Sequence, residues 1–409
     1  MTTVTIDRLG HLGDGIAATA EGPVFAPRTL PGEVVRGSPE RDTLHDIKID
    51  TPSDDRVKPP CPVYNTCGGC AVQHASDAFV TDWKVGIVRE ALRAHAIDPQ
   101  FRNVHTSPPA SRRRAKLSGR RTKSGAIVGF HGRGSHSLAD ASRCHVLSPD
   151  LTRVIPALQE LVGKVGSRKA TVEMTVTATQ TGLDLDVTGA PPPEAADLGW
   201  FAHWARTSGI VRLSWAGEAV LEEAAPRVTF GEYPVTPPPG AFLQATPDGE
   251  AALVSAVQGA LGGVGKTVDL FGGCGTFALS VLPDRDVHLV EGDAALTTAA
   301  LDAWKARSGG PILTTETRDL FRNPLDVDDL RTFEAAIIDP PRAGAAAQTQ
   351  MLADSAVHQI ASVSCNPVTF ARDARALIDA GFTLDWVDVV DQFRWSTHVE
   401  LAASFRRDG

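Results

Sequence analysis

From residue 267 onward, short apolar segments alternate with longer segments rich in Ala and Leu. The apolar segments have the length and composition of buried strands and lie at residues 267–271, 287–290, 335–338 and 361–364. Strands that alternate with helices are typical of a doubly wound parallel sheet. The alternation therefore predicts an α/β fold for the C-terminal part of the chain.

The first 55 residues have a different pattern. Strand-like segments at residues 4–6, 16–18, 23–26 and 33–35 are separated by glycines. Short strands at this spacing predict a small β-barrel of the OB type. The all-β pattern ends at the turn-rich residues 51–55, just before a cysteine-rich segment.

The region between these two parts has mixed character. Residues 77–95 have apolar side chains at helical spacing, and residues 171–176 and 183–187 predict a β-hairpin. The prolines at 237–239 mark a boundary, because proline resists both helix and central strand. We expect three domains, at residues 1–57, 58–238 and 239–409, which agrees with 409 residues at about 150 per domain.

Charge and hydropathy exclude several classes of protein. No run of 18 apolar residues is present, and Asp7 and Arg8 stand where a signal peptide needs its apolar core. We therefore expect a cytoplasmic protein without a membrane partner. The net charge of -9 argues against a broadly basic nucleic-acid coat but allows a local basic patch.

A glycine-rich loop follows the first strand of the predicted α/β fold. The loop at residues 272–277 lacks Cβ atoms at three positions, so its backbone amides can approach a ligand at a helix start. The next strand ends in Glu291, whose carboxylate can accept both hydroxyls of a ribose. The loop predicts S-adenosylmethionine or a dinucleotide as ligand, and a plain strand-to-helix turn is the alternative.

Reactive side chains follow three later strand segments. Asp339 is expected at the carboxyl edge of the sheet, where open α/β folds bind ligands; capping of the next helix is the alternative. Cys365 lies at a strand tip before a helix, a place that we expect to favour its thiolate, although a lone cysteine in an apolar strand is usually packing. His398 and Glu400 are two apart, so we expect them on one face of the last strand, as in ordinary surface alternation.

Cysteines cluster outside the α/β part. Cys61, Cys67 and Cys70 have the spacing C-x5-C-x2-C, and Cys144 supplies a fourth thiol further along. Six cysteines in a chain of this length are too few for a disulfide scaffold. The spacing favours structural zinc and an iron–sulfur cluster equally, with free thiols as the less favoured alternative.

The segment 112–123 is strongly basic. It holds seven Lys or Arg side chains in twelve residues and no acid. On an acidic protein this concentration predicts a track for RNA phosphates, and a solvated basic hairpin is the alternative.

In their order, five motifs resemble the bacterial RNA uracil-5-methyltransferases: Phe242-Leu243-Gln244, Asp269-Leu270-Phe271-Gly272-Gly273-Cys274-Gly275, Asp339-Pro340-Pro341-Arg342, Ser364-Cys365-Asn366-Pro367 and His398-Val399-Glu400. The resemblance covers nearly the whole chain, because that family commonly carries an N-terminal TRAM domain of the OB type. It implies a multidomain α/β protein with a TRAM barrel, a mixed α+β central domain with the cysteine cluster, and a C-terminal class I methyltransferase fold. Its reaction is methyl transfer from S-adenosylmethionine to C5 of a uridine in RNA.

The resemblance also implies roles for single residues. Cys365 adds to C6 of the uracil, and Glu400 removes the C5 proton before Cys365 is expelled. The cofactor-binding residues are expected to be Gln244, Phe271, Thr276, Glu291, Asp319 and Asp339. Departures from the family pattern stand at Gly272, Cys274, Thr246 and Thr276, and an asparagine is often found at the last of these positions.

The family's ribosomal-RNA branch carries a 4Fe-4S cluster on the same cysteine pattern. The resemblance therefore assigns such a cluster to Cys61, Cys67, Cys70 and Cys144, and favours 23S rRNA over tRNA as substrate. We expect a monomer that has no DNA partner. The alternatives are a tRNA uracil-5-methyltransferase, a dinucleotide oxidoreductase, which leaves Cys365 and Glu400 unexplained, and a non-catalytic cluster-bearing RNA-binding protein.

Overall fold

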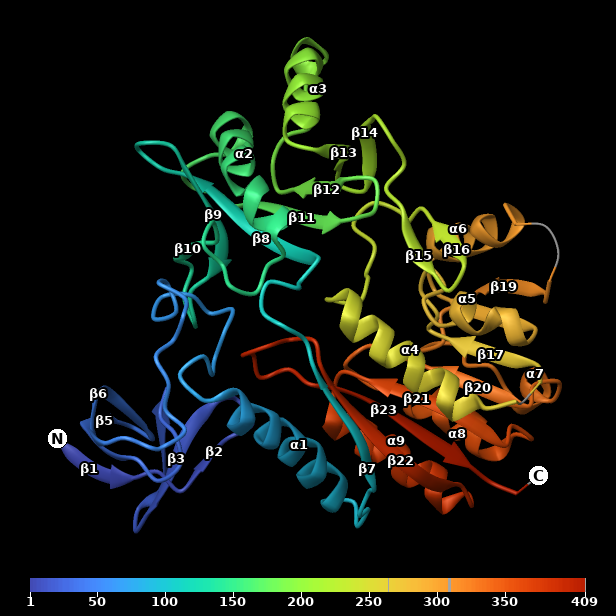
Figure 1. The fold of residues 1–409 in the computed structure, drawn as a ribbon, viewed down its shortest axis with the longest axis horizontal. Helices are drawn as coiled ribbons and strands as arrows, with labels where there is room; N and C mark the ends of the chain where they lie inside the picture. Colours follow the sequence, from blue (N-terminus) through green and yellow to red (C-terminus); the bar gives the residue numbers. More distant parts are fainter. Residues whose placement is uncertain (264, 308–309, 409) are drawn as a thin grey trace.

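The computed structural model describes residues 1–263, 265–307 and 310–408. These residues form sheets of six, seven and eight strands and a separate two-stranded hairpin. In Figure 1 the six-stranded sheet forms the lower left lobe, the seven-stranded sheet the upper lobe, and the eight-stranded sheet the lower right. The chain is thus a multi-sheet protein of the α/β class.

The N-terminal sheet has the strand order β1-β5-β6-β4-β3-β2. Its strands are β1 (Thr2–Thr5), β2 (Arg8–Leu9), β3 (Asp14–Thr19), β4 (Gly22–Pro27), β5 (Val34–Glu40) and β6 (Thr43–Thr51). A small core of Ile6, Ala17, Ala26, Val35 and Leu44 holds it together. The sequence did not predict β6, because most of its side chains are exposed and the apolar alternation is weak. The OB-type barrel and the TRAM domain stay predictions.

The upper sheet has the order β10-β9-β8-β11-β12-β13-β14. Its strands are β8 (Arg114–Arg121), β9 (Ala126–His131), β10 (Leu138–Asp140), β11 (Val172–Ala178), β12 (Leu183–Thr188), β13 (Ile210–Trp215) and β14 (Glu218–Glu222). Helices α2 (Pro149–Val165) and α3 (Leu198–Thr207), the latter preceded by the short helix η1 (Ala195–Asp197), pack their apolar faces on it. The predicted hairpin is confirmed as β11 and β12, which pair antiparallel.

The large sheet has the order β19-β18-β17-β20-β21-β23-β22-β7. Its strands are β7 (Phe101–Thr106), β17 (Thr267–Leu270), β18 (Val287–Glu291), β19 (Leu313–Thr317), β20 (Ala335–Ile338), β21 (Gln359–Ser364), β22 (Thr383–Asp391) and β23 (Glu400–Arg406). Strands β17 to β21 pair in parallel, whereas β23 runs antiparallel to both β21 and β22. The four predicted strands of this part are confirmed.

Helices cover both faces of this sheet, as the alternation predicts. They are α4 (Pro247–Leu261), α5 (Ala278–Val281), α6 (Ala294–Lys305), α7 (Val327–Leu330), α8 (Ala346–Asp354) and α9 (Pro367–Asp379), with the short helix η2 (Leu282–Asp284) after α5. Ala336 and Ile338 of β20 enter one core, and Ala335 and Ile337 enter the other. The strand order reverses between β17 and β20, which is where ligands bind in sheets of this kind.

The expected domain boundaries differ from the observed packing at two places. Helix α1 (Asp77–Arg93) contacts α9 and β22, and β7 pairs with β22 at the sheet edge (Figure 1). The hairpin β15 (Val228–Phe230) and β16 (Tyr233–Val235) packs into a core of the large sheet. Segments of the expected central domain therefore pack on the C-terminal fold: Val88 and Leu92 of α1 lie in its core, although Val80 lies in a separate cluster with Leu9 and Leu30.

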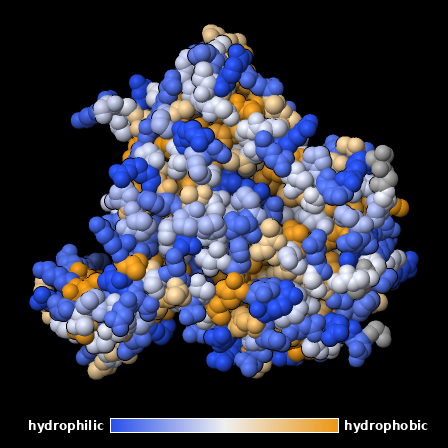
Figure 2. Space-filling view, in the orientation of Figure 1, coloured by the Kyte–Doolittle hydropathy of each residue, from blue (hydrophilic) through white to orange (hydrophobic). Residues whose placement is uncertain are grey.

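The surface is mainly polar. Figure 2 shows mostly hydrophilic side chains on the viewed face, with hydrophobic ones in small separate groups. Exposed large apolar side chains are spread over several elements and include Leu12, Val104, Phe242, Phe321 and Val368. Of the helices in the described ranges, none combines the length and the hydropathy needed to cross a membrane.

Candidate active site

The glycine loop lies at the carboxyl end of β17, next to the end of β18. Gly273 and Gly275 have φ angles of 55° and 91°, which side chains with a Cβ rarely adopt, and Phe271 has a φ of 61°. The backbone N–H of Gly273 donates to Glu291 Oε2 at 3.1 Å, and that of Gly292 donates to Oε1 at 2.7 Å. The structure therefore brings Phe271 and Glu291 together around one loop, which also carries the partly buried Thr276.

Asp269 stabilises this loop through a buried hydrogen bond, a role that the sequence did not reveal. Its side chain is fully buried, and Oδ2 accepts a hydrogen bond of 2.9 Å from the backbone N–H of Ala278. Burial, together with the charges of Asp339 and Glu291, raises the pKa of Asp269 to about 8. An acidic residue inside an otherwise apolar strand is the sequence signal for such a position.

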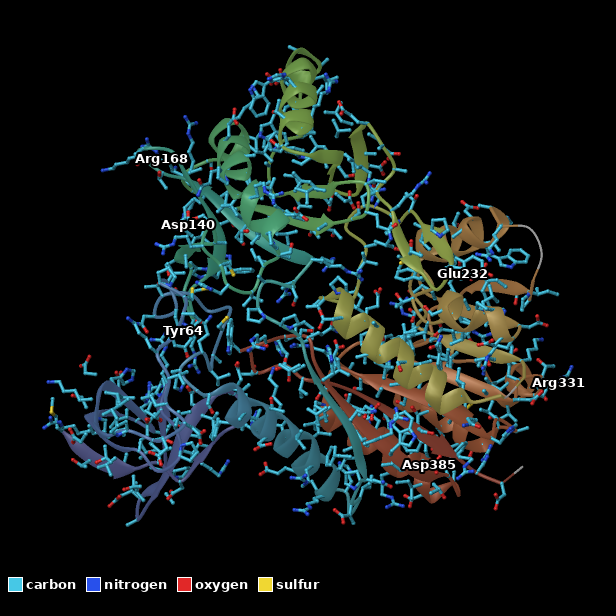
Figure 3. All side chains as sticks on the ribbon, in the orientation of Figure 1. Tyr64, Asp140, Arg168, Glu232, Arg331 and Asp385 are labelled. Atoms are coloured by element: carbon cyan, nitrogen blue, oxygen red, sulfur yellow. The ribbon has the colours of Figure 1, made fainter. Side chains whose placement is uncertain are left out.

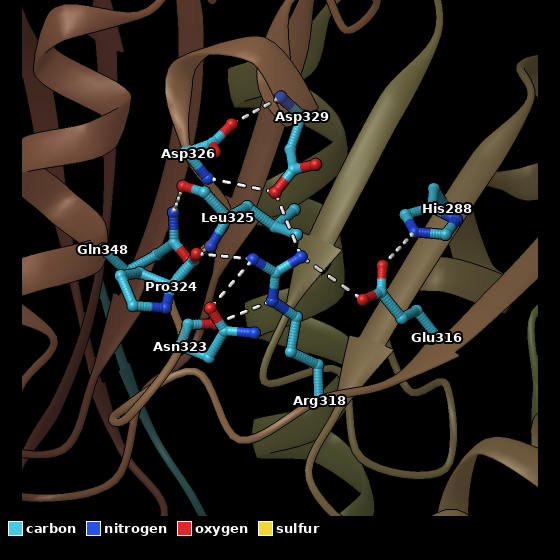
Figure 4. A network of polar contacts seen from close by, with 9 residues as sticks. All are labelled: His288, Glu316, Arg318, Asn323, Pro324, Leu325, Asp326, Asp329 and Gln348. Atoms are coloured by element: carbon cyan, nitrogen blue, oxygen red, sulfur yellow. Dashed lines mark hydrogen bonds and ion pairs between the residues drawn. The ribbon is translucent and has the colours of Figure 1, made fainter.

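Asp319 follows β19, next to Arg318, and Figure 4 shows the contacts of the Arg318 guanidinium. The Arg318 guanidinium donates to the carbonyls of Asn323 and Pro324 at 2.7 and 2.8 Å. It also forms ion pairs with Glu316 and Asp329.

The turn after Asp319 reaches the glycine loop through an aromatic contact. The exposed Asp319 carboxylate accepts the N–H of Phe321, and the Phe321 ring lies 5.3 Å from that of Phe271. This braced turn thus stands beside the glycine loop, and the cofactor contact of Asp319 stays a prediction.

Cys365 stands between β21 and α9 and is partly buried. Asn366 caps α9 by accepting the N–H of Val368 through Oδ1, and its Nδ2 donates to the Arg342 carbonyl at 2.8 Å. This hydrogen bond joins the loop that carries Cys365 to the loop that carries Asp339 and Arg342.

The expectation that this position favours the Cys365 thiolate is wrong for the protein alone. Burial, followed by the negative charges of Glu400 and Asp339, raises the pKa of the Cys365 thiol. The Arg342 charge and a backbone hydrogen bond act in the opposite direction without outweighing the burial.

Two carboxylates and two amides form one buried network beside Cys365. Gln244 Nε2 donates to Asp339 Oδ2 at 3.4 Å, and Gln392 Nε2 donates to Gln244 Oε1 at 2.5 Å. Gln392 Nε2 also donates to Glu400 Oε2. The structure therefore brings together Gln244, Asp339 and Glu400, and it adds Gln392, which lies outside the motifs that the sequence analysis used.

Burial controls the protonation of both carboxyl groups. It raises the pKa of Asp339 to about 7. Burial and the Asp339 charge raise the pKa of Glu400 to about 8, against the effect of the Gln392 hydrogen bond. Groups that titrate near neutral pH are suited to proton transfer.

His398 does not share a strand face with Glu400. Strand β23 begins at Glu400, and His398 is exposed in the loop before it. The His398 ring instead lies within hydrogen-bond distance of Arg342, with an N–N distance of 2.7 Å. The expected alternation fails because His398 and Val399 lie before the first paired residue of β23.

Only part of the basic segment faces solvent. Arg113 pairs with Glu250 at 2.5 Å and donates to the Gln244 carbonyl, and Arg114 donates to the carbonyls of Gly240 and Ala241. These two arginines brace the segment that carries Gln244, so the prediction of one continuous phosphate track is wrong for them. The side chains of Lys116, Arg121 and Lys123 are exposed.

The four cysteines predicted to bind a metal group line one common pocket. Cys61, Cys67, Cys70 and Cys144 share it with the largely buried Arg112, and its labelled neighbours Tyr64 and Asp140 appear in Figure 3. Burial and the charges of the other three cysteines raise the pKa of Cys70 to about 12. Within the described ranges, no three His, Cys, Asp or Glu side chains form a group that could hold a metal ion.

Similar proteins match nearly the full chain. An uncharacterized RNA methyltransferase of Rhizobium meliloti is 40% identical over 99% of this chain and 99% of its own length. The 23S rRNA (uracil(1939)-C(5))-methyltransferase RlmD of Burkholderia pseudomallei is 32% identical over 94% of this chain and 89% of its own length. The model of the tRNA (Uracil-5-)-methyltransferase family matches residues 314–407.

A solved structure supports the same fold. That of Pyrococcus abyssi tRNA (uracil-54, C5)-methyltransferase in complex with S-adenosyl-L-homocysteine matches with a TM-score of 0.75. The match covers 99% of this chain and 100% of the other, at 20% identity. The doubly wound sheet, with its glycine loop and acidic strand ends, defines an α/β methyltransferase. With these relatives, the chain belongs to the RNA uracil-5-methyltransferase family.

Proposed function

We propose that this enzyme transfers the methyl group of S-adenosylmethionine to C5 of a uridine in 23S rRNA through a covalent adduct at Cys365. The observation that carries the proposal is the convergence of Cys365, Asp339 and Glu400 at the ends of the paired strands β21, β20 and β23. Uracil C5 is a poor nucleophile until another group adds at C6. A thiol beside two carboxyls supplies both the nucleophile and a base.

The proposed steps balance as follows. Cys365 loses its proton to water and its sulfur adds to C6, which places the electron pair in a C5 enolate. The enolate takes the methyl group, and S-adenosylhomocysteine leaves. Glu400 then removes the C5 proton, the C5–C6 double bond forms again, and the Cys365 thiolate is expelled.

The proposed cofactor site follows the carboxyl edge of the sheet. Glu291 is set to accept hydrogen bonds from the ribose hydroxyls, and its carboxylate already accepts backbone N–H groups of the glycine loop. Phe271 and Asp319 are assigned to the adenine end, and Thr276 to the loop beside it. Gln244 and Asp339 belong to the end where the methyl group meets the uracil.

We assign a 4Fe-4S cluster to Cys61, Cys67, Cys70 and Cys144, although no three of these thiols form a group that could hold a single metal ion in the described structure. All four line one pocket, and thiolates are the ligands that such clusters use. The segment that follows Cys70 also contacts the loop before Glu400. The backbone N–H groups of Ala71 and Val72 donate to the Trp395 carbonyl at 2.8 and 3.1 Å. A group bound there would supply structural order to this loop, and methyl transfer itself needs no redox step.

The preference for 23S rRNA rests on the relative RlmD, which matches this chain over most of both lengths. The exposed cations Lys116, Arg121 and Lys123 on and beside β8 are the proposed contacts to RNA phosphates. The N-terminal sheet, proposed as a TRAM domain of the OB type, adds a second RNA-facing lobe.

Transfer of tritiated methyl groups tests the proposal directly. Anaerobically purified protein is incubated with labelled S-adenosylmethionine and unmodified 23S rRNA or, separately, tRNA, and the product nucleosides are analysed. We expect 5-methyluridine in 23S rRNA. Label in tRNA alone would keep the reaction and overturn the substrate. No label in either RNA, with the cofactor bound, would overturn the catalytic proposal.

A further inference from the structure

We propose that Gln392 is a positioning residue that holds Glu400 for removal of the C5 proton and, through Gln244, aligns the methyl-transfer end of the site. The inference rests on the proposed function and adds a residue outside the five motifs. Gln392 follows β22 directly and is 1% exposed. Glu400 opens the neighbouring strand β23, where it pairs with Val390.

The orientation of the Gln392 amide follows from its contacts. The backbone N–H of Thr246 donates to Gln392 Oε1 at 3.3 Å. Because the oxygen is occupied on that side, Nε2 faces the other way and donates to both Glu400 Oε2 and Gln244 Oε1. One amide group thus donates its two NH2 hydrogens to two side chains of the candidate site.

The same contacts orient Gln244. Since Gln244 Oε1 accepts from Gln392, its own Nε2 points toward Asp339, where it donates to Oδ2 at 3.4 Å. Removing the Gln392 amide would leave Gln244 free to turn its oxygen toward the Asp339 carboxylate. The network therefore couples the Asp339 and Glu400 ends of the site.

The fold makes room for this side chain at Gly249 on α4. A Cβ at position 249 would lie 2.7 Å from Gln392 Cβ and 2.7 Å from Thr246 Oγ1. Contacts this short do not occur between real side chains, so a larger residue would push Gln392 away. Gly249 thus leaves space for the Gln392 side chain, and the Thr246 N–H holds its amide oxygen.

Charged and titratable groups reach Glu400 from several elements. The charges of Asp339, after β20, and Asp391, at the end of β22, raise the pKa of Glu400. The Cys365 thiol, after β21, titrates near the same carboxyl. Lys84 of α1 forms an ion pair with Asp391. Burial and the charges of Asp339 and Asp391 favour the protonated carboxyl of Glu400. Gln392 provides the hydrogen bond that favours the carboxylate, the form that accepts the C5 proton. It also occupies Oε2, which leaves Oε1 for the substrate.

The test measures adduct decay as a function of pH for wild-type protein and Gln392→Met. In a single turnover with uridine-containing RNA, the covalent protein–RNA adduct is trapped at intervals from about pH 6 to about pH 10. We expect the midpoint of proton removal to rise by about one pH unit in Gln392→Met and the adduct to persist about 10-fold longer at neutral pH. Decay near the wild-type rate is expected at the alkaline end. Gln258→Met, which removes a glutamine amide on α4 that donates to the Ser280 carbonyl, is the control.

Each result decides a different point. The positioning role would be overturned if the pH midpoint of adduct decay in Gln392→Met equalled that of the wild type. This holds whether decay is unchanged or is slowed by the same factor at every pH. Gln392→Asn, which keeps the amide but shortens its reach, is expected to show the same upward shift and serves if Gln392→Met does not fold. Absence of any adduct or 5-methyluridine with the wild type would instead overturn the proposed function.

Discussion

Lys84 of α1 and Asp391 at the end of β22 form a buried ion pair with an Nζ–Oδ1 distance of 2.5 Å. Lys84 Nζ also donates to the Phe393 carbonyl at 3.1 Å, so a residue near the start of the chain holds the loop that leads to Glu400. The Lys84 and Asp391 side chains are 1% and 3% exposed. A charge in such a place is costly unless it is paired.

Replacing Lys84 is therefore expected to destabilise the protein strongly. Lys84→Met leaves Asp391 buried without its partner, and we expect the free energy of unfolding to fall by about 3–5 kcal/mol. Denaturant unfolding measures it. The double variant Lys84→Met/Asp391→Leu should regain much of the stability, because neither charge is then buried. Equal stabilities of the single and double variants would contradict this account.

Cys365→Ala is expected to lower methyl transfer by at least about 1,000-fold, since the nucleophile is gone. It should form no covalent adduct with RNA that contains 5-fluorouridine, while S-adenosylmethionine binding, measured by calorimetry, stays near the wild-type value. Glu400→Gln is the matched variant and should accumulate the adduct with ordinary RNA instead. Methylation by Cys365→Ala at the wild-type rate would refute the nucleophile assignment.

Asp269 is expected to make stability fall as pH rises from about 4 to about 8. Its pKa is raised from 3.8 to about 8 in the folded protein, so the folded state binds the proton more tightly than the unfolded state. Unfolding becomes easier as the pH rises through this window and changes no further above it. Asp269→Asn should flatten the profile in unfolding experiments at several pH values. A variant with the wild-type slope would show that the carboxyl is ionised throughout.

The three exposed cations are expected to carry part of the RNA affinity. Replacing Lys116, Arg121 and Lys123 by Ala should weaken binding of 23S rRNA fragments. The slope of log K against log salt should become shallower by about 0.7 for each RNA phosphate that the variant no longer neutralises. Lys305→Ala removes an exposed cation at the end of α6 and is the control. A salt slope that does not change would remove these three side chains from the RNA interface.

Cys144→Ser is expected to reduce the iron and acid-labile sulfide of anaerobically purified protein, because it removes one of the four proposed thiol ligands. The absorbance in the visible range should fall with the iron content. Zinc in place of iron in the wild-type protein would contradict the cluster assignment. The variant should also be cleaved more readily in the loop before Glu400, since Ala71 and Val72, which follow Cys70, hold that loop through Trp395.

Local patterns in the sequence were sufficient for the parallel strands, the glycine loop, and the placement of Asp339 and Cys365 after strands. In those segments, composition and spacing depend on neighbours close along the chain. Strand β6 escaped prediction because its mostly exposed side chains weaken the alternation. The role of α1 and β7 escaped it as well, because their partners α9 and β22 lie in a distant part of the chain.

The sequence by itself determined the α/β alternation and the order of the motifs, because strand and turn formation respond to nearby residues. Tertiary structure alone decided the chemical state of the site. The pKa of Cys365 is raised rather than lowered because folding buries the thiol and also brings the charges of Glu400 and Asp339 near it. Arg113 became a brace because folding brings Glu250 to it. Gln392 gained its place because its partners Gln244 and Glu400 meet only in the folded chain.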